Sequence, residues 1–221
     1  MARLKTGLVT IESGSISNLV IVSRNGKTFV RVKPAKRGTP KSMRTRQQND
    51  HFKATYGLLS RFKTMLREYM RLGNGDSGWS RALSINLNRI TSEADGLVRL
   101  HPNLAFVTAG KLAEPASLRV ERTPVSLRIY WSDATRCFEG RALHGGFEGL
   151  SYVEGHPTDT IRVILDSGMA ATLLPAQAFR SDGMLEIPLA IGTIDRGMAL
   201  YVFALSASQQ EVSFSSYLQV P

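Results

Sequence analysis

The sequence predicts an α+β fold with an N-terminal β-hairpin, a two-helix middle and a C-terminal antiparallel Ig-like β-sandwich. An Asn25-Gly26 pair separates two apolar runs, and this pair is typical of a two-residue hairpin turn. Apolar residues then recur at three- and four-residue steps, as in a helix. Short alternating runs separated by turn residues follow, as in a sandwich. We therefore expect a basic hairpin with an extended linker in 1–46, a helical segment in 47–95 and the sandwich in 96–221.

The predicted hairpin begins at Ile16 and returns through residues 27–33, after a short strand over Leu8–Ile11 and a turn at 12–15. Alternation on the return strand gives it one basic face and one apolar face, the latter made by Val30 and Val32. Two strands alone are only marginally stable in water. The apolar face must therefore pack on the rest of the chain or on a neighbouring subunit.

A helical period extends from about Arg46 to Leu72. Its apolar stripe, which we expect to be core, contains Phe52, Tyr56, Leu59, Phe62, Leu66 and Tyr69. A glycine-rich break follows, after which Asp76 or Ser77 can cap a second helix that ends near Ser92.

The remaining chain alternates short apolar runs with turns. We expect strands near Ala105–Thr108, Ser117–Glu121, Ser126–Trp131, Thr160–Leu165, Ala171–Leu174, Met184–Ala190, Ala199–Ser206 and Val212–Val220. Residues 136–157 are the least regular part, and we expect a long loop there that carries Cys137, His144 and His156.

The positive charge is confined to the first half of the chain. The net charge of the 221 residues is +10, but residues 1–101 carry +13 and residues 102–221 carry −3. Residues 13–49 hold nine Lys or Arg and no Asp or Glu. Such asymmetry indicates a polyanionic partner, nucleic acid being one candidate, although a solvated surface or a subunit contact gives the same pattern. The candidate contact residues are Arg24, Lys27, Arg31, Lys33, Lys36, Arg37, Lys41, Arg44 and Arg46.

Cofactor, metal and membrane motifs are missing from the sequence. Cys137 is the single cysteine, which excludes an internal disulfide, and the four histidines lack metal-ligand spacing. We expect no cofactor, because no phosphate-binding or dinucleotide-binding glycine motif occurs. No apolar run is long enough to span a membrane, and the first residues do not form a secretory signal. We therefore expect synthesis in the cytoplasm, with the final compartment left open.

Two short motifs resemble protease loops. The segment Ile164–Gly168 reads apolar-apolar-Asp-Ser-Gly, like the catalytic loop of single-lobed aspartic proteases, in which two chains each supply one Asp. The competing interpretation of Asp166 is a hairpin turn, because Asp-Ser-Gly is common turn chemistry. Gly75-Asp76-Ser77-Gly78 matches a chymotrypsin-like nucleophile segment, but we interpret it as the helix-capping turn.

Four segments resemble an uncharacterised protein family typical of Bacteroidota. They are Ser13-Gly14-Ser15-Ile16-Ser17, Phe29-Val30-Arg31-Val32-Lys33-Pro34, Arg44-Thr45-Arg46-Gln47-Gln48-Asn49 and Ser213-Phe214-Ser215-Ser216-Tyr217-Leu218. They match, in order, a glycine-rich hairpin, a second strand, a helix start and a closing strand of that family. Ser15 and Ser17 replace two of its hairpin glycines. The resemblance implies a helical middle and an Ig-like sandwich, and it implies no activity.

These observations predict a non-enzymatic structural or binding protein whose basic N-terminal region engages an acidic partner. One alternative is a self-assembling subunit of a phage particle or surface filament, in which the hairpin adds a strand to its neighbour. A minor alternative is a dimeric aspartic protease that uses Asp166.

Overall fold

The chain divides into two compact units, residues 1–42 and residues 43–221, in the computed structural model. The residues that the structure describes are 4–5, 10–11, 13–16, 19–24, 27–33, 42–72, 77–94, 96–132, 153–189, 195 and 197–221. Most of the predicted long loop, including Cys137 and His144, lies outside these described residues, as does Asp76.

The first unit contains the predicted hairpin. Its strands are β1 (Leu4–Lys5), β2 (Thr10–Ile11), β3 (Ser13–Ile16), β4 (Leu19–Arg24) and β5 (Lys27–Val32). β4 and β5 pair antiparallel from Leu19↔Val32 to Arg24↔Lys27, and β3 adds to the other side of β4. Asn25 and Gly26 lie outside the described residues. The predicted boundaries are corrected here, because residues 13–16 form a strand where a turn was expected and β4 begins at Leu19.

The described part of the helical segment holds three helices. They are α1 (Met43–Ser60), α2 (Lys63–Tyr69) and α3 (Gly78–Asn86). The predicted single helix is therefore broken at Arg61 and Phe62. The side chain of Ser77 accepts a hydrogen bond from the Ser80 N–H at 3.2 Å, as predicted for the cap of α3.

The end of the second helix was predicted too late. The observed helix, α3, ends at Asn86. A hairpin of β6 (Thr91–Ala94) and β7 (Leu97–Leu100) follows, with Gly96 at a φ of 74°. A left-handed φ of this kind suits glycine, which lacks a Cβ. A short 3₁₀ turn, η1 (Pro102–Leu104), follows.

The predicted strand over residues 105–108 is wrong. This segment is buried but irregular, and the Val107 and Thr108 N–H groups both donate to the hydroxyl of Ser215, at 3.0 and 3.4 Å. A side-chain acceptor thus replaces the ladder partner that an apolar run usually indicates.

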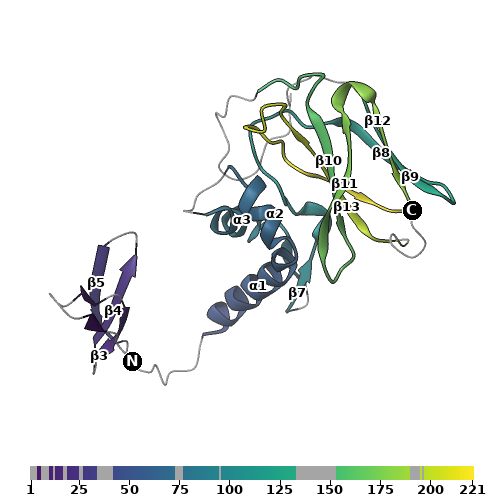
Figure 1. Ribbon diagram of the computed structural model, residues 1–221. Helices are drawn as coiled ribbons and strands as arrows, with labels where there is room; N and C mark the ends of the chain where they lie inside the picture. Colours follow the sequence, from purple (N-terminus) through teal and green to yellow (C-terminus); the bar gives the residue numbers. More distant parts are fainter. Residues whose placement is uncertain are drawn as a thin grey trace. The chain divides into compact units, whose positions relative to one another are not determined.

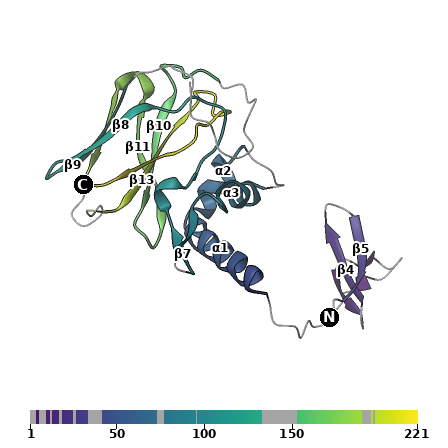
Figure 2. The same ribbon diagram turned by 180° about the vertical axis from the view of Figure 1, so that it is seen from behind.

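Two antiparallel sheets form the sandwich (Figures 1 and 2). One sheet has the order β11 (Ala171–Phe179), β10 (Thr160–Asp166), β13 (Ala199–Leu205) and β14 (Ser216–Gln219). The other has the order β12 (Met184–Pro188), β9 (Ser126–Ser132) and β8 (Ala116–Arg122). Alternate residues such as Ile129 and Val163 fill the space between them and are fully buried. The predicted α+β class with a C-terminal sandwich is confirmed.

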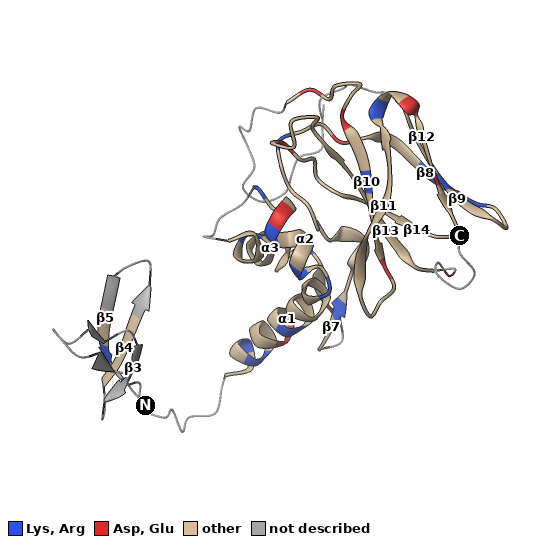
Figure 3. Cartoon of the chain, in the orientation of Figure 1, with Lys and Arg blue, Asp and Glu red and all other residues tan. Residues whose placement is uncertain are grey.

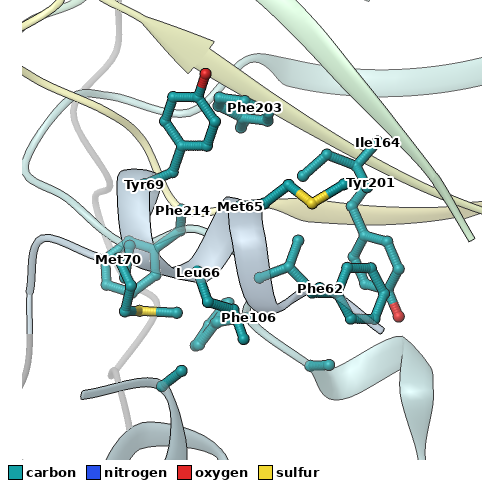
Figure 4. Packing of buried hydrophobic residues seen from close by; sticks show 14 of the residues in the cluster. Phe62, Met65, Leu66, Tyr69, Met70, Phe106, Ile164, Tyr201, Phe203 and Phe214 are labelled. Carbon is teal, nitrogen blue, oxygen red and sulfur yellow. The ribbon is translucent and has the colours of Figure 1, made fainter. Parts of the chain in front are cut away.

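A second apolar cluster lies on the opposite face of the four-stranded sheet, where α2 packs (Figure 4). The Phe62 ring meets the Tyr201 ring edge-on at 5.2 Å, and Tyr69 lies 5.1 Å from Phe203. Burial of such aromatic pairs stabilises the helix on the sheet.

The predicted apolar stripe is core only from Leu59 onward. Phe52 and Tyr56 are 45% and 47% exposed, so the first half of α1 is not covered as expected. Tyr56 instead packs edge-on against Trp79 at 5.2 Å, which gives α1 a partly exposed aromatic flank.

Candidate interface for an acidic partner

Four of the nine candidate cations have described side chains. They are Arg31, Lys33, Arg44 and Arg46, and all four are exposed. Arg24 and Lys27 are described only as the backbone pair that closes the β4–β5 ladder. The other three, Lys36, Arg37 and Lys41, lie outside the described residues.

The first two cations lie on and directly after β5. This strand is at the edge of its sheet among the described residues, with β4 on its paired side. Arg31 pairs with Val20 in the ladder, and its neighbours Val30 and Val32 are 60% and 65% exposed. Phe29, on the same face as Arg31, is 54% exposed. β5 thus presents both positive charge and apolar side chains to solvent.

The other two cations occupy the first turn of α1, which holds no acidic residue. The first turn of a helix carries a partial positive charge, so Arg44 and Arg46 are unfavourable there by about 0.3–1 kcal/mol each. Their position therefore does not serve the stability of the helix. Figure 3 shows Lys and Arg along α1, and of these Lys53 makes an exposed pair with Asp50 at 3.6 Å.

Two buried or partly buried cations of the second unit are held by carboxylates. Arg61 contacts Asp166 at 3.0 Å, and fully buried Arg180 lies 3.5 Å from Asp159. By contrast, none of the four described candidate cations has an ion-pair partner among the described residues. The charges of these four side chains are therefore not neutralised by a carboxylate among the described residues.

A further ion pair lies on the surface of the three-stranded sheet. Arg128 lies 3.0 Å from Glu186 across β9 and β12. The Ser126 hydroxyl, which donates to Glu186, is the main cause of a lowered pKa of that carboxyl, and Arg128 lowers the pKa further.

Asp166 of the protease-like motif is buried and ion-paired at the end of β10. Its carboxylate accepts hydrogen bonds from the Arg61 guanidinium at 3.0 Å and from the Gly168 N–H at 2.9 Å. The Ser167 N–H donates to the Ala170 carbonyl at 3.1 Å, which closes the turn. This geometry is that of Asp-Ser-Gly turn chemistry with an added ion pair.

Other features of the described residues offer less to a ligand. A shallow cavity of about 300 Å³ lies between α2 and β11, lined by residues that include Arg61, Glu68, Tyr69 and Thr172. No group of three or more His, Cys, Asp or Glu side chains that could hold a metal ion occurs in the described part of the chain. None of the described helices has the length and apolar character needed to cross a bilayer.

Sequence reasoning missed the partly exposed aromatic flank that lies further along the helix whose first turn contains Arg44 and Arg46. Phe52 and Tyr56 have ordinary core spacing, and no local signal distinguishes them from the buried residues further along. The signal for the cations was stronger, since an acid-free basic stretch is visible in the sequence.

Comparison with protein-family models, with curated proteins and with solved structures found no match. The resemblance to a Bacteroidota-type family therefore stays a prediction.

Proposed function

We propose that this chain is a non-enzymatic binding protein whose basic N-terminal region engages an acidic partner. The observation that carries the proposal is a difference in pairing. The described candidate cations Arg31, Lys33, Arg44 and Arg46 are exposed and have no carboxylate partner among the described residues, whereas Arg61 and Arg180 are held in ion pairs.

The physical basis of such binding is charge complementarity. Exposed cations that face a polyanion release its condensed counterions, so affinity falls steeply as salt is added. Residues 13–49 contain no acidic side chain that would oppose this attraction. Nucleic acid and an acidic protein both satisfy this chemistry, and aromatic residues do not alternate with the basic ones in residues 33–46 as stacking on bases would favour.

The test compares three charge-reversed full chains with the parent. One carries Arg31→Glu and Lys33→Glu, and the second carries Arg44→Glu and Arg46→Glu. The control carries Lys63→Glu and Lys111→Glu, which change the net charge equally at exposed positions of the second unit. Fluorescence anisotropy measures binding of labelled duplex DNA and of polyglutamate at low and moderate salt.

We expect salt-sensitive binding of at least one of these probes, weakened about tenfold by each N-terminal pair and little by the control. Equal weakening by all three variants would assign the effect to net charge alone. Binding that does not respond to salt would contradict the proposal.

A second candidate function is self-assembly through the hairpin. It is favoured by the exposed apolar residues of β5, Val30 and Val32, which lie on an edge strand. Sedimentation of the parent and of a chain that lacks residues 1–42 separates the two functions. If the hairpin mediates self-assembly, the parent forms oligomers and the shortened chain does not.

A further inference from the structure

The open edge of β5 has an unusual combination of properties. Among the described residues, its backbone N–H and C=O groups on the side away from β4 have no ladder partner. Its side chains alternate strictly: Phe29, Arg31 and Lys33 lie on one face, and Val30 and Val32 on the other. All five are exposed. An added strand would therefore meet Arg31 and Lys33 together with the apolar Phe29 on one face, and the apolar side chains Val30 and Val32 on the other.

The apolar face continues onto β4. Leu19 is the ladder partner of Val32, and Ile21 is the partner of Val30, so these four residues share one face. Ile21 is buried, while Leu19 is 38% exposed. An apolar side chain on an added strand would lie over Val30 or Val32 and extend this face.

A second copy of β5 is a poor occupant of this edge, because like charges meet. In a two-fold antiparallel pairing, residues on the same face must lie opposite one another. Centring the pair on Val30 places Lys27 opposite Lys33, and centring it on Arg31 places Arg31 opposite itself. Centring it on Phe29 places Lys27 opposite Arg31. Each of these registers sets one cation against another, which destabilises the sheet.

An acidic strand turns this cross-strand repulsion into attraction. A Glu or Asp opposite Arg31 or Lys33 forms a cross-strand pair of opposite charge, and such a pair stabilises the sheet. Cations on an edge strand normally prevent strand addition. They prevent it for neutral and basic strands, and they favour it for an acidic one.

We infer that the acidic partner is an extended peptide segment with alternating acidic and apolar residues, which adds to β5 as an antiparallel strand. The inference rests on the proposed function and names its partner class. Main-chain hydrogen bonds supply affinity that does not depend on sequence, while the alternation of charge and apolar side chains supplies selectivity. A nucleic acid cannot make the main-chain ladder or fill the apolar face.

The experiment uses the full chain and a short labelled peptide of alternating Glu and Val. The matched control is the same peptide with its central amides N-methylated, which keeps every charge and side chain but removes the donors of the ladder. Labelled duplex DNA and a polyglutamate of similar charge serve as the other anionic probes. A chain with Arg31→Glu and Lys33→Glu is also offered a peptide of alternating Lys and Val.

We expect the Glu-Val peptide to bind more tightly than polyglutamate or DNA, and N-methylation to weaken it about tenfold or more. The charge-reversed chain should lose the Glu-Val peptide and gain the Lys-Val peptide, because the ladder and the apolar face remain. This exchange also shows that the variant is folded.

Two results would overturn the inference while leaving the proposed function in place. One is equal binding of the N-methylated peptide, and the other is a preference for DNA or polyglutamate that is lost in the charge-reversed chain. If no acidic probe binds in a salt-sensitive way, both the inference and the proposed function are wrong. If the parent forms oligomers through β5, the occupant of this edge is a second copy of the chain and the peptide inference is wrong.

Discussion

At the scale of single residues, Asp166 connects the sandwich to the helices. It is the last residue of β10 and is 4% exposed, and its partner Arg61 belongs to the break between α1 and α2. Replacing Asp166 with Asn leaves the Arg61 guanidinium without its charge partner. We expect the free energy of unfolding to fall by about 1–3 kcal/mol, measured by urea denaturation.

A double-mutant cycle with Arg61→Gln checks this assignment. Because the two side chains interact directly, the double variant should be less destabilised than the sum of the single changes. Additive effects would show that the pair does not couple.

The same Asp166→Asn chain also tests the aspartic-protease alternative: we expect neither form to cleave an unstructured protein, and cleavage by the parent alone would establish that enzyme.

Tyr201 makes the fold less stable at alkaline pH. Its hydroxyl donates to the Pro102 carbonyl at 3.0 Å, and burial, with a smaller contribution from the charge of Asp166, raises its pKa well above the ordinary value of 10.0. The unfolded chain loses this proton at a lower pH than the folded chain. Stability is therefore complete below about pH 10 and decreases as the pH rises above it.

A Tyr201→Phe chain should show a shallower loss of stability above about pH 10. At neutral pH it should be less stable by about 0.5–1.5 kcal/mol, because the hydrogen bond is lost. Some slope should remain, since burial also raises the pKa of Tyr69 and of Tyr217. Denaturation at neutral and at alkaline pH measures both effects, and parallel pH profiles of the two chains would contradict the assignment.

At the scale of elements, two glycines in helices have opposite roles. A Cβ at Gly57 in α1 would meet no atom within 4 Å, whereas a Cβ at Gly78 would lie 2.0 Å from the Leu66 carbonyl oxygen in α2. Gly78 thus permits the close approach of α3 to α2, and Gly57 serves no packing need among the described residues.

The two alanine variants form a matched pair. Gly57→Ala should stabilise the chain by about 0.5–1 kcal/mol, because alanine loses less backbone freedom on folding. Gly78→Ala should destabilise it by about 1–3 kcal/mol, because backbone must shift to relieve the contact. Thermal unfolding of both variants measures the difference, and a loss of stability at Gly57 would show a hidden constraint on α1.

At the scale of the whole molecule, the two large apolar clusters belong to the second unit. Both large clusters draw their buried residues from positions 58–220, and one of them joins the helices to the sandwich. A chain that begins at Met43 should therefore fold alone and unfold at nearly the temperature of the parent. Calorimetry measures this, and an aggregated or non-cooperative fragment would show that residues 1–42 are needed for folding.

Several elements could be predicted because their signals are local. A two-residue turn between paired strands demands backbone angles that the Asn-Gly pair favours, and Ser77 satisfies a free N–H group at the start of a helix. The strands β9, β10 and β13 also lie where their apolar runs predict them. The candidate interface was visible for a similar reason, since an acid-free basic stretch needs no knowledge of distant residues.

Other features depend on contacts between distant residues. The Ser215 hydroxyl, 107 positions after Thr108 in sequence, accepts hydrogen bonds from Val107 and Thr108, whose segment forms no strand. Periodicity could not show that Phe52 stays half exposed while Phe62, on the same predicted stripe, is fully buried. A side chain on this stripe is buried only where the rest of the fold packs against it, as the four-stranded sheet does against Phe62.

By itself, the amino-acid sequence determined the α+β class, the hairpin turn and the surplus of positive charge in the first half of the chain. Only the tertiary structure decided which cations are neutralised. Arg61 meets Asp166 from 105 positions away because α2 packs on β10, while Arg31 and Arg44 meet no carboxylate among the described residues. Charge is a property of each residue, but pairing requires two side chains to be brought within a few ångströms, and folding alone does that.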